Sequence, residues 1–370
     1  MFDKKEYEVL IVGAGPVGCV LAERFASVAN KKVLLIDKRD HLAGNCYDVK
    51  HSGVLIHKYG PHYFRTNDKY LMEYLSNFTE WIDGNYYVTS KYKNEYYPFP
   101  INRITINKFY NKNFTKDDEV KEFIDTLVEK IDYPTNSEEF VLSRLGERLY
   151  KAFYFGYTIK QWNLHPKELG PSVCGRIPVR YNDDCRYVDH KYQYTPKLGF
   201  SKLFENMVKH SNIEVKLNTN LNEVDKENYK IIIYTGAIDE YFNFKEGKLK
   251  WRSLKFEFEE VKKEFVQPNV QINYSDEFEY TRSVEIKHIT KQKCKNTVIS
   301  YEYPTDIGDP YYPIPNNENE IIYQKYKKLA DIETKLKNVY FCGRLAEYKY
   351  YNTDEVILKA LKLFNEIKYR

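Results

Sequence analysis

The sequence lacks several features that would assign it to common structural classes. Its six cysteines form no C-x-x-C pair, so neither a zinc site nor a disulfide framework is indicated, and a reducing compartment is favoured. The most apolar stretch, residues 9–22, contains three glycines and is shorter than the roughly 20 residues of a membrane helix. The charged N-terminus has no apolar segment typical of a signal peptide. We therefore expect a cytoplasmic protein with no metal site and no membrane partner.

The charge balance is also unremarkable. Lys and Arg total 57 and Asp and Glu total 53, which gives a formal net charge of +4 without a long basic block. Bulk electrostatics therefore gives no reason to expect a nucleic-acid partner. A chain of 370 residues, 42% of them apolar, is long enough for about two or three lobes with substantial cores.

Residues 9–37 have the pattern of a βαβ unit. An apolar strand, Val9–Val12, precedes a glycine-rich turn, and a second strand, Val33–Ile36, follows a helix. The apolar face expected for this helix consists of Val17, Leu21, Phe25 and Val28.

The turn between the first strand and the helix contains a G-x-G-x-x-G motif. Gly13 permits a tight turn, Gly15 lets the backbone approach a pyrophosphate, and Gly18 permits close contact between helix and sheet. Asp37 stands at the end of the second strand, where a carboxylate can bind a ribose hydroxyl and disfavours the 2′-phosphate of NADP. The pattern indicates an FAD or NAD site; the alternative is a turn without a ligand and a solvated Asp37.

The rest of the chain divides into regions of different periodicity. Residues 102–164 have helical spacing, with Val141, Leu145, Leu149 and Phe153 on one face. Alternating runs in residues 250–303, such as Val284-Ile286-His288 and residues 298–301, predict antiparallel strands. Residues 231–236 and 339–343 resemble buried strands that end at glycine, and residues 353–367 predict a final helix.

These patterns predict an α/β fold with a discontinuous dinucleotide-binding domain and two insertions. The expected dinucleotide-binding domain contains residues 1–78, 196–245 and 325–370. The expected helical domain contains residues 100–170, and the expected antiparallel sheet domain contains residues 79–99, 171–195 and 246–324.

Several stretches, in order from one end of the chain to the other, resemble UDP-galactopyranose mutases, flavoenzymes that interconvert pyranose and furanose forms of a UDP-sugar. The stretches are residues 13–18, 37–45, 57–67, 156–162, 176–180, 252–256, 280–282, 308–313 and 343–351. The resemblance implies a doubly wound FAD-binding domain, a helical bundle and a twisted antiparallel sheet. It also implies reduced FAD as cofactor and a reaction without net redox, in which flavin N5 forms an adduct with the anomeric carbon. Such chemistry belongs to the cofactor, so the protein positions groups and stabilises charge.

The same resemblance assigns roles to individual residues. The arginines that match the family's diphosphate-binding pair are Arg176 and Arg282, and the tyrosines expected to hold the same diphosphate are Tyr157, Tyr187, Tyr312 and Tyr350. The residues expected beside the uridine are Phe153, Tyr154, Thr158, Trp162 and Asn273. His62 matches the histidine beside the flavin ring. The other residues expected at FAD are Lys38, Gly44, Asn45, Gly343, Arg344 and Tyr351, with Gly343 and Arg344 opening the last helix at the pyrophosphate.

Two positions depart from the family pattern. Position 65 is Arg where many galactose-specific bacterial members have a second histidine, and Asn352 stands where Asp often follows the paired tyrosines. An arginine near the sugar can donate hydrogen bonds to an acetamido carbonyl at C2. We therefore expect UDP-N-acetylgalactosamine to be a substrate as well as, or instead of, UDP-galactose.

Three alternative functions stay open. An FAD-dependent oxidoreductase of the amine-oxidase type shares the glycine motif, a non-catalytic protein would only bind UDP, and a mutase could act on another nucleotide sugar. The resemblance also implies an electron donor that reduces FAD, a homodimer, and a product used in capsule or lipopolysaccharide synthesis.

Overall fold

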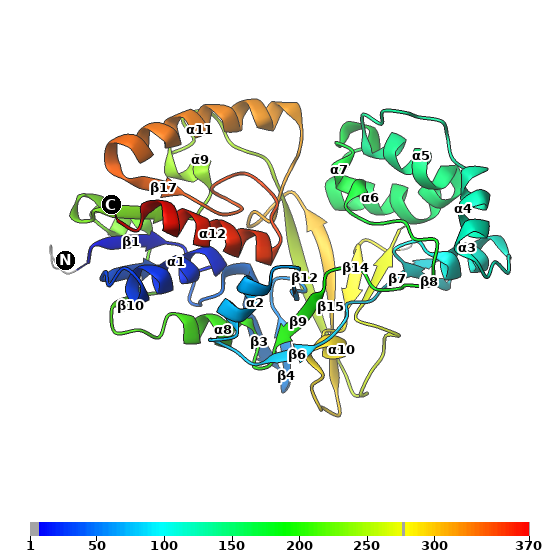
Figure 1. Ribbon diagram of the computed structural model, residues 1–370, viewed down its shortest axis with the longest axis horizontal. Helices are drawn as coiled ribbons and strands as arrows, with labels where there is room; N and C mark the ends of the chain where they lie inside the picture. The colour runs from blue at the N-terminus through cyan, green and yellow to red at the C-terminus, as the bar shows by residue number, and fades with distance from the viewer. Residues whose placement is uncertain (1–6, 276–277, 370) are drawn as a thin grey trace.

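A five-stranded parallel sheet contains the N-terminal βαβ unit (Figure 1). The computed structural model describes residues 7–275 and 278–369. The spatial order of the strands is β10 (Ile213–Lys216), β2 (Val33–Ile36), β1 (Val9–Val12), β11 (Ile231–Tyr234) and β17 (Val339–Phe341). All four neighbouring pairs are parallel. The four strands predicted from apolar runs are thus confirmed and lie side by side.

Helices pack against both faces of this sheet. One face holds α1 (Pro16–Ser27), α8 (Phe200–Met207) and α12 (Thr353–Ile367), and α9 (Ile238–Tyr241) and α11 (Asn317–Lys337) pack on the other side. Successive strand residues face opposite ways: Tyr340 packs toward α1 and α12, whereas Phe341 packs toward α9 and α11. The bounds predicted for the last helix are confirmed. Val28 was wrongly placed on the buried face of α1, because it caps the helix end and is 53% exposed.

A second sheet of seven strands lies between the parallel sheet and the helical region (Figure 1). Its order is β16 (Tyr312–Pro313), β12 (Trp251–Val261), β15 (Thr297–Thr305), β14 (Arg282–Val284), β13 (Gln271–Tyr274), β7 (Val88–Tyr92) and β8 (Glu95–Phe99). All pairs are antiparallel except β13 with β7. The strand predicted through His288 is wrong: β14 ends at Val284, and α10 (Lys287–Thr290) begins three residues later.

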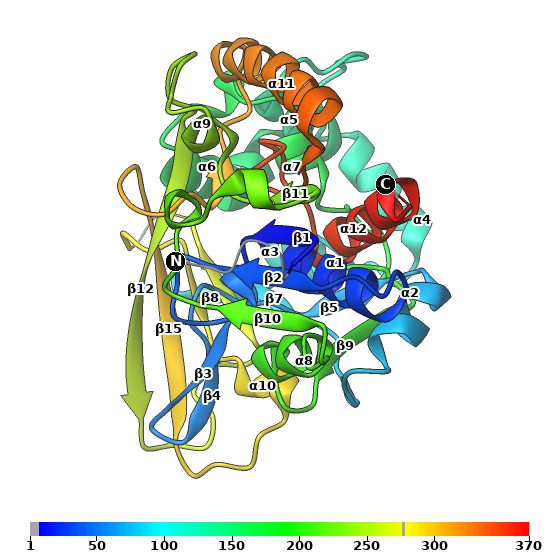
Figure 2. The same ribbon diagram turned by 90° about the vertical axis from the view of Figure 1, so that its left-hand side faces the viewer.

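Smaller sheets join these parts. The hairpin of β3 (Asp48–His51) and β4 (Val54–His57) packs beside the long strands β12 and β15 (Figure 2). A three-stranded sheet contains β5 (Phe64–Thr66), β9 (Tyr192–Pro196) and β6 (Trp81–Asp83), and α2 (Lys69–Leu75) follows β5.

The helical region lies at the far side of the seven-stranded sheet (Figure 1). It contains α3 (Arg103–Tyr110), α4 (Asp117–Asp125), α5 (Ser137–Leu149), α6 (Gly156–Trp162) and α7 (Ser172–Gly175). The helical spacing of Val141, Leu145, Leu149 and Phe153 is confirmed, since all four are buried in one core, but Phe153 lies in a π-helical turn, Tyr150–Phe155, between α5 and α6. Such turns are rare and frequently occur at functional sites.

In the described part of the chain, no helix combines the length and the apolar character needed to cross a membrane. The domain boundaries given above stay a prediction.

Candidate active site

A cavity of about 820 Å³ opens at the carboxyl edge of the parallel sheet. The residues that follow four of its strands line the cavity: Gly13 after β1, Asp37 after β2, Thr235 after β11 and Gly343 after β17. Because the carboxyl ends of parallel strands are where α/β sheets bind ligands, the topology alone makes this cavity the candidate cofactor site.

Two glycine turns form the floor of the cavity by close backbone approach. Gly13 has φ +104°, and a Cβ there would lie 2.0 Å from Thr235 Oγ1. A Cβ at Gly44, which has φ +53°, would lie 3.0 Å from the Cα of Gly15. Gly18 does not line the cavity; a Cβ there would lie 1.9 Å from the Gly13 carbonyl oxygen, so Gly18 lets α1 pack on the turn. Side chains at Gly13 or Gly44 would therefore push these turns away from their neighbours and disturb the floor of the cavity.

Asp37 holds the first glycine turn in place. Its carboxylate accepts hydrogen bonds from the backbone N–H of Ala14 at 2.6 Å and of Arg39 at 2.8 Å. Lys38 and Asn45 also line the cavity, and Asn45 Oδ1 accepts a hydrogen bond from Arg39 at 2.9 Å. The carboxylate thus orders the loop and keeps further lone pairs on the cavity side.

His62 lines the cavity as a neutral imidazole. Its Nδ1 lies 2.9 Å from the carbonyl oxygen of Gly60, which can only accept, so Nδ1 carries the proton and Nε2 is an acceptor. Burial lowers the pKa of His62 to about 4, and the charges of Arg344 and Arg282 contribute in the same direction. The backbone N–H of His62 donates to His57 Nδ1 at 2.9 Å, and burial lowers the pKa of His57 to about 3.

Gly343, Arg344 and Tyr351 line the cavity, but Gly343 and Arg344 do not open the last helix as predicted. The helix α12 begins at Thr353, and a turn separates it from Gly343. Arg344 donates to the carbonyl oxygens of Tyr351 at 3.0 Å and Tyr311 at 3.3 Å. These bonds fix Arg344 between the cavity and a second polar region, which surrounds Tyr350.

That second region is an arginine cluster around the ring of Tyr350. Its members are Arg65, Arg176, Arg282 and Arg344. The guanidinium carbons of Arg344 and Arg176 lie 4.8 Å and 5.4 Å from the centroid of the Tyr350 ring. Burial raises the pKa of the Tyr350 hydroxyl, but the four positive charges outweigh this effect and lower the pKa below its usual value. Tyr350 is nevertheless 38% exposed, so the cluster is open to solvent; the space beside Tyr350 and these four arginines is called the cleft below.

Arg176 contributes a free cation to this cleft. Among the residues that the structure describes, its guanidinium forms no hydrogen bond and no ion pair, and its side chain is exposed. An arginine that stacks on a tyrosine and keeps all five N–H groups available is arranged to bind an anion.

Arg282 reaches the tyrosine pair Tyr312 and Tyr350 from β14. It donates from a terminal nitrogen to the Tyr312 hydroxyl at 3.1 Å, and the Tyr312 ring stacks on that of Tyr350 at 5.8 Å. Trp162 packs against Tyr312 with ring centroids 6.1 Å apart. Burial raises the pKa of Tyr157 to about 12 although Arg282 lies near, so this hydroxyl stays protonated and able to donate.

Glu302 is a site residue that the sequence analysis missed. It is fully buried on β15, directly opposite Arg282 on β14, and its Oε2 accepts from Arg282 Nε at 2.6 Å. Its Oε1 has no hydrogen-bond partner among the described residues. Burial raises the pKa of Glu302, and Arg282 partly opposes this. The predicted strand ended at residue 301; extending it by one residue would have included this acid.

The residues expected beside the uridine lie on α6, the π-helical turn and β13. Trp162 and Thr158 are buried on α6, and Asn273 is buried on β13 opposite Arg282. Phe153 packs in the core of the helical region, against Tyr92, Tyr97 and Phe109, and Tyr154 packs against Phe99.

Arg252, a second missed residue, holds the end of α6. Its Nε donates to the carbonyl oxygen of Gln161 at 2.9 Å and a terminal nitrogen donates to that of Lys160 at 3.3 Å. Helix C-termini leave such carbonyls without intrahelical partners. The contact therefore ties the helix that carries Trp162 to strand β12.

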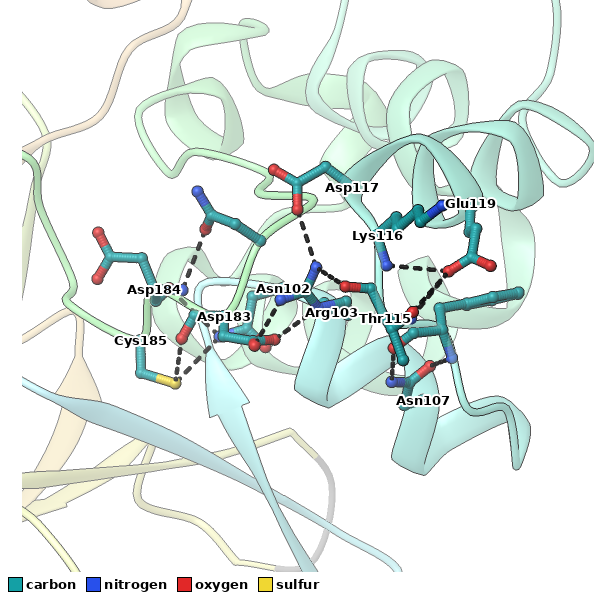
Figure 3. Close-up of polar contacts among 12 residues, drawn as sticks. Asn102, Arg103, Asn107, Thr115, Lys116, Asp117, Glu119, Asp183, Asp184 and Cys185 are labelled. Carbon is teal, nitrogen blue, oxygen red and sulfur yellow. Dashed lines mark hydrogen bonds and ion pairs between the residues drawn. The ribbon is translucent and has the colours of Figure 1, made fainter.

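Tyr187 and Arg65 complete the cleft. The segment before Tyr187 is anchored to α3, where Arg103 donates to the carboxylates of Asp183 and Asp117 at 2.5–2.9 Å (Figure 3). Arg65 on β5 donates to the hydroxyl of Tyr63 at 2.8 Å and to Asn352 Oδ1 at 2.7 Å.

Comparison with known proteins agrees with this geometry. The profile of the UDP-galactopyranose mutase family matches residues 152–350, and that of NAD(P)-binding Rossmann-like domains matches residues 11–78. A probable UDP-galactopyranose mutase of Klebsiella pneumoniae is 35% identical over 97% of this chain and 94% of its own length. A dTDP-fucopyranose mutase of Escherichia coli is 34% identical over 96% of this chain and 97% of its own.

Solved structures share the fold. A reduced UDP-galactopyranose mutase superposes with a TM-score of 0.79 at 15% identity, covering 98% of this chain and 93% of the other. Wild-type putrescine oxidase bound to putrescine has a TM-score of 0.60 at 12% identity, covering 98% and 99%. The predicted α/β fold is therefore confirmed, and the fold alone does not separate mutases from amine oxidases. The matched family profile and the relatives aligned over nearly their whole length separate the two. This chain belongs to the UDP-galactopyranose mutase family and is a pyranose–furanose mutase, an isomerase.

Proposed function

We propose that the protein uses FAD in its reduced form to interconvert the pyranose and furanose forms of a UDP-sugar without net redox. The observation that carries the proposal is the group of four arginines beside the exposed ring of Tyr350, in which, among the described residues, only Arg282 forms an ion pair, with Glu302, and Arg176 forms none. Such a surplus of positive charge suits a nucleotide diphosphate that must leave the sugar and return to it.

The cavity fits FAD. The two glycine turns leave room for a pyrophosphate at the start of α1, where the helix N-terminus offers N–H donors and a positive dipole end. In this proposal Asp37 and Lys38 hold the adenosine side, Gly13, Gly15, Gly44 and Arg344 hold the pyrophosphate, and His62 lies at the flavin ring. The bound reduced flavin supplies the nucleophile for the anomeric carbon.

The chain's own residues bind and retain the diphosphate. Arg176 follows α7 and Arg282 lies on β14, so two separate elements each supply a guanidinium, and the diphosphate oxygens remain held after the bond to the sugar breaks. The hydroxyls of Tyr157 and Tyr312 are protonated donors for the same oxygens. Trp162 and its neighbours on α6 and β13 provide a platform and polar atoms for the base.

The identity of the sugar that we propose rests on Arg65. Its two hydrogen bonds to the protein use two of five N–H groups, which leaves donors for a substituent of the sugar. We therefore propose UDP-N-acetylgalactosamine as a substrate besides, or in place of, UDP-galactose. The dTDP-fucopyranose mutase among the relatives makes dTDP-fucose the second candidate.

The experiment offers UDP-galactofuranose, UDP-N-acetylgalactofuranosamine and dTDP-fucofuranose separately to dithionite-reduced holoenzyme under anaerobic conditions. Chromatography separates pyranose from furanose products. The Arg65→His variant should lose activity selectively on the N-acetyl sugar. An equal loss on galactose and the N-acetyl sugar would contradict the role of Arg65, and conversion of the fucose nucleotide alone would assign the substrate to the second candidate.

A homodimer and a cellular reductant of the flavin belong to the same proposal. Light scattering of the holoenzyme measures the first, and reduction of bound flavin by NADH or NADPH under anaerobic conditions measures the second.

A further inference from the structure

Asn352 connects Arg65 to the last helix. Its side-chain Oδ1 accepts the hydrogen bond from Arg65 at 2.7 Å, and its backbone N–H donates to Glu355 Oε2 at 2.7 Å as the N-cap residue of α12. The second donor position of Arg65 is held by the Tyr63 hydroxyl. Both partners that fix the guanidinium are neutral groups, and in the described part of the chain Arg65 forms no ion pair with a carboxylate.

Because both hydrogen-bond partners of Arg65 are neutral, neither of them cancels its positive charge in the cleft. Arg282 is paired with Glu302, whereas Arg65 and Arg176 form no ion pair with a described residue. The buried carboxylate of Asp354 lies near enough for Arg65 to oppose the rise of its pKa on burial, so a second carboxylate at position 352 would add to a negative charge already present. A carboxylate in place of the Asn352 amide would keep an acceptor at the same distance but would cancel the charge of Arg65. An amide fixes the orientation of the fork and leaves the charge intact.

We propose that Asn352 is a positioning residue that directs the guanidinium of Arg65 toward the nucleotide sugar and, by being uncharged, keeps its positive charge available for the ligand. The inference rests on the proposed function, since it concerns how the same cleft binds its substrate. The charge of Arg65 acts on the Tyr350 hydroxyl together with those of Arg176, Arg344 and Arg282, so a loss of its charge would weaken the whole anion site.

Asn352→Asp and Asn352→Ala separate the two parts of this role. Asp is as good an N-cap residue as Asn, so Asn352→Asp should leave the melting temperature of the holoenzyme unchanged. It should raise the Kd for UDP and the KM for the preferred sugar about tenfold or more, with a smaller change in kcat. Asn352→Ala keeps the charge of Arg65 and should weaken binding less than Asn352→Asp. Asn316→Asp, the same exchange at the N-cap of α11, is the matched control and should behave like the unchanged protein.

A double variant tests whether the effect passes through Arg65. In an Arg65→Ala background, Asn352→Asp should weaken UDP binding no more than Asn352→Ala does. The inference is overturned if Asn352→Asp binds UDP as tightly as the unchanged protein, if Asn352→Ala weakens binding more than Asn352→Asp, or if Asn352→Asp has the same effect without Arg65.

Inorganic pyrophosphate provides a readout that does not need a nucleotide sugar. Its Kd on the same variants measures the charge of the arginine cluster directly. If the unchanged protein converts no nucleotide sugar, the proposed function fails, but a weaker pyrophosphate affinity of Asn352→Asp would still support the role of Asn352. If conversion is found and pyrophosphate affinity does not change, only the present inference fails.

Discussion

At the scale of single residues, the ion pair between Glu302 and Arg282 decides how this arginine presents its charge. The carboxylate fixes Nε, so the terminal nitrogens are directed to Tyr312 and the cleft. Glu302 is fully removed from water and the Arg282 side chain is 18% exposed, and a charge so largely buried is stable only when it is paired.

Glu302→Ala should therefore lower the free energy of unfolding by about 3–5 kcal/mol, because it leaves a buried arginine without its counterion. Denaturant unfolding followed by circular dichroism measures this. Glu257→Ala removes a carboxylate from the exposed pair with Lys255 and should cause little measurable change. Equal stability of the two variants would show that the Glu302 pair contributes nothing.

The two buried histidines predict loss of stability in acid. The folded-state pKa values of His62 and His57, about 4 and about 3, lie below the usual value of 6.5, so both are neutral in the folded protein and protonate more easily when it unfolds. Their stabilising contribution is complete above pH 6.5 and is lost as the pH falls toward the folded values.

His57→Asn keeps an acceptor for the backbone of His62 but removes one titrating group. Between pH 6.5 and about 4, the slope of the unfolding free energy against pH should therefore become shallower by about 1.4 kcal/mol per pH unit. Chemical denaturation at several pH values measures the slope. An unchanged slope would mean that His57 does not resist protonation in the folded state.

At the scale of elements, the glycine turn works because α1 packs directly on it. A Cβ at Gly18 would collide with the Gly13 carbonyl oxygen at 1.9 Å, so an added methyl group must displace either the helix or the turn. Gly18→Ala should yield protein with little or no bound flavin, measured as flavin absorbance per protein after purification. Gly170→Ala places its methyl group in open space and is the control. Full flavin content in Gly18→Ala would contradict the role of this turn.

The end of α6 gives a second prediction at this scale. Arg252→Ala removes the donors of the last carbonyls of the helix that carries Trp162, and it should raise the Kd for UDP about tenfold, because the base platform is no longer held. Lys255→Ala, on the same strand, should leave UDP binding unchanged. If Arg252→Ala binds UDP normally, the position of α6 does not depend on this contact.

At the scale of the whole molecule, the site exists only where three parts meet. Arg176 follows α7 of the helical region, Arg282 and Glu302 lie on the seven-stranded sheet, and Arg344 follows β17 of the parallel sheet. Tyr350, which lies among these arginines, is 38% exposed, so the site can be reached from solvent, as a substrate that enters and leaves requires.

The sequence predicted those parts of the fold and site that depend on residues close together along the chain. The β1–α1–β2 unit and α12 followed from apolar periodicity, and the glycine turn followed from residues that no other side chain could replace. Glu302 was not predicted as a site residue, because its role as the partner of Arg282 depends on the pairing of β14 with β15. That pairing joins residues that lie far apart in the sequence.

At two places the structure departs from the local pattern for the same reason. The alternation through His288 resembled a strand, but the seven-stranded sheet ends its pairing at Val284. The helical segment with Phe153 is kinked at Gly146, which has φ +75° and where a Cβ would lie 2.3 Å from the carbonyl oxygen of Leu127, and it continues as the π-helical turn from Tyr150. Tertiary contacts override local preference at both places.

The central claim, isomerisation without net redox, is tested most directly by following the flavin and the sugar together. Holoenzyme reduced by dithionite is mixed anaerobically with its preferred furanose nucleotide, and the flavin absorbance and the chromatographic product are recorded over many turnovers. We predict steady formation of the pyranose while the flavin remains reduced, and no product from oxidised enzyme. Reoxidation of the flavin in step with substrate loss, or no isomerised sugar from flavin-loaded reduced enzyme, would contradict the account.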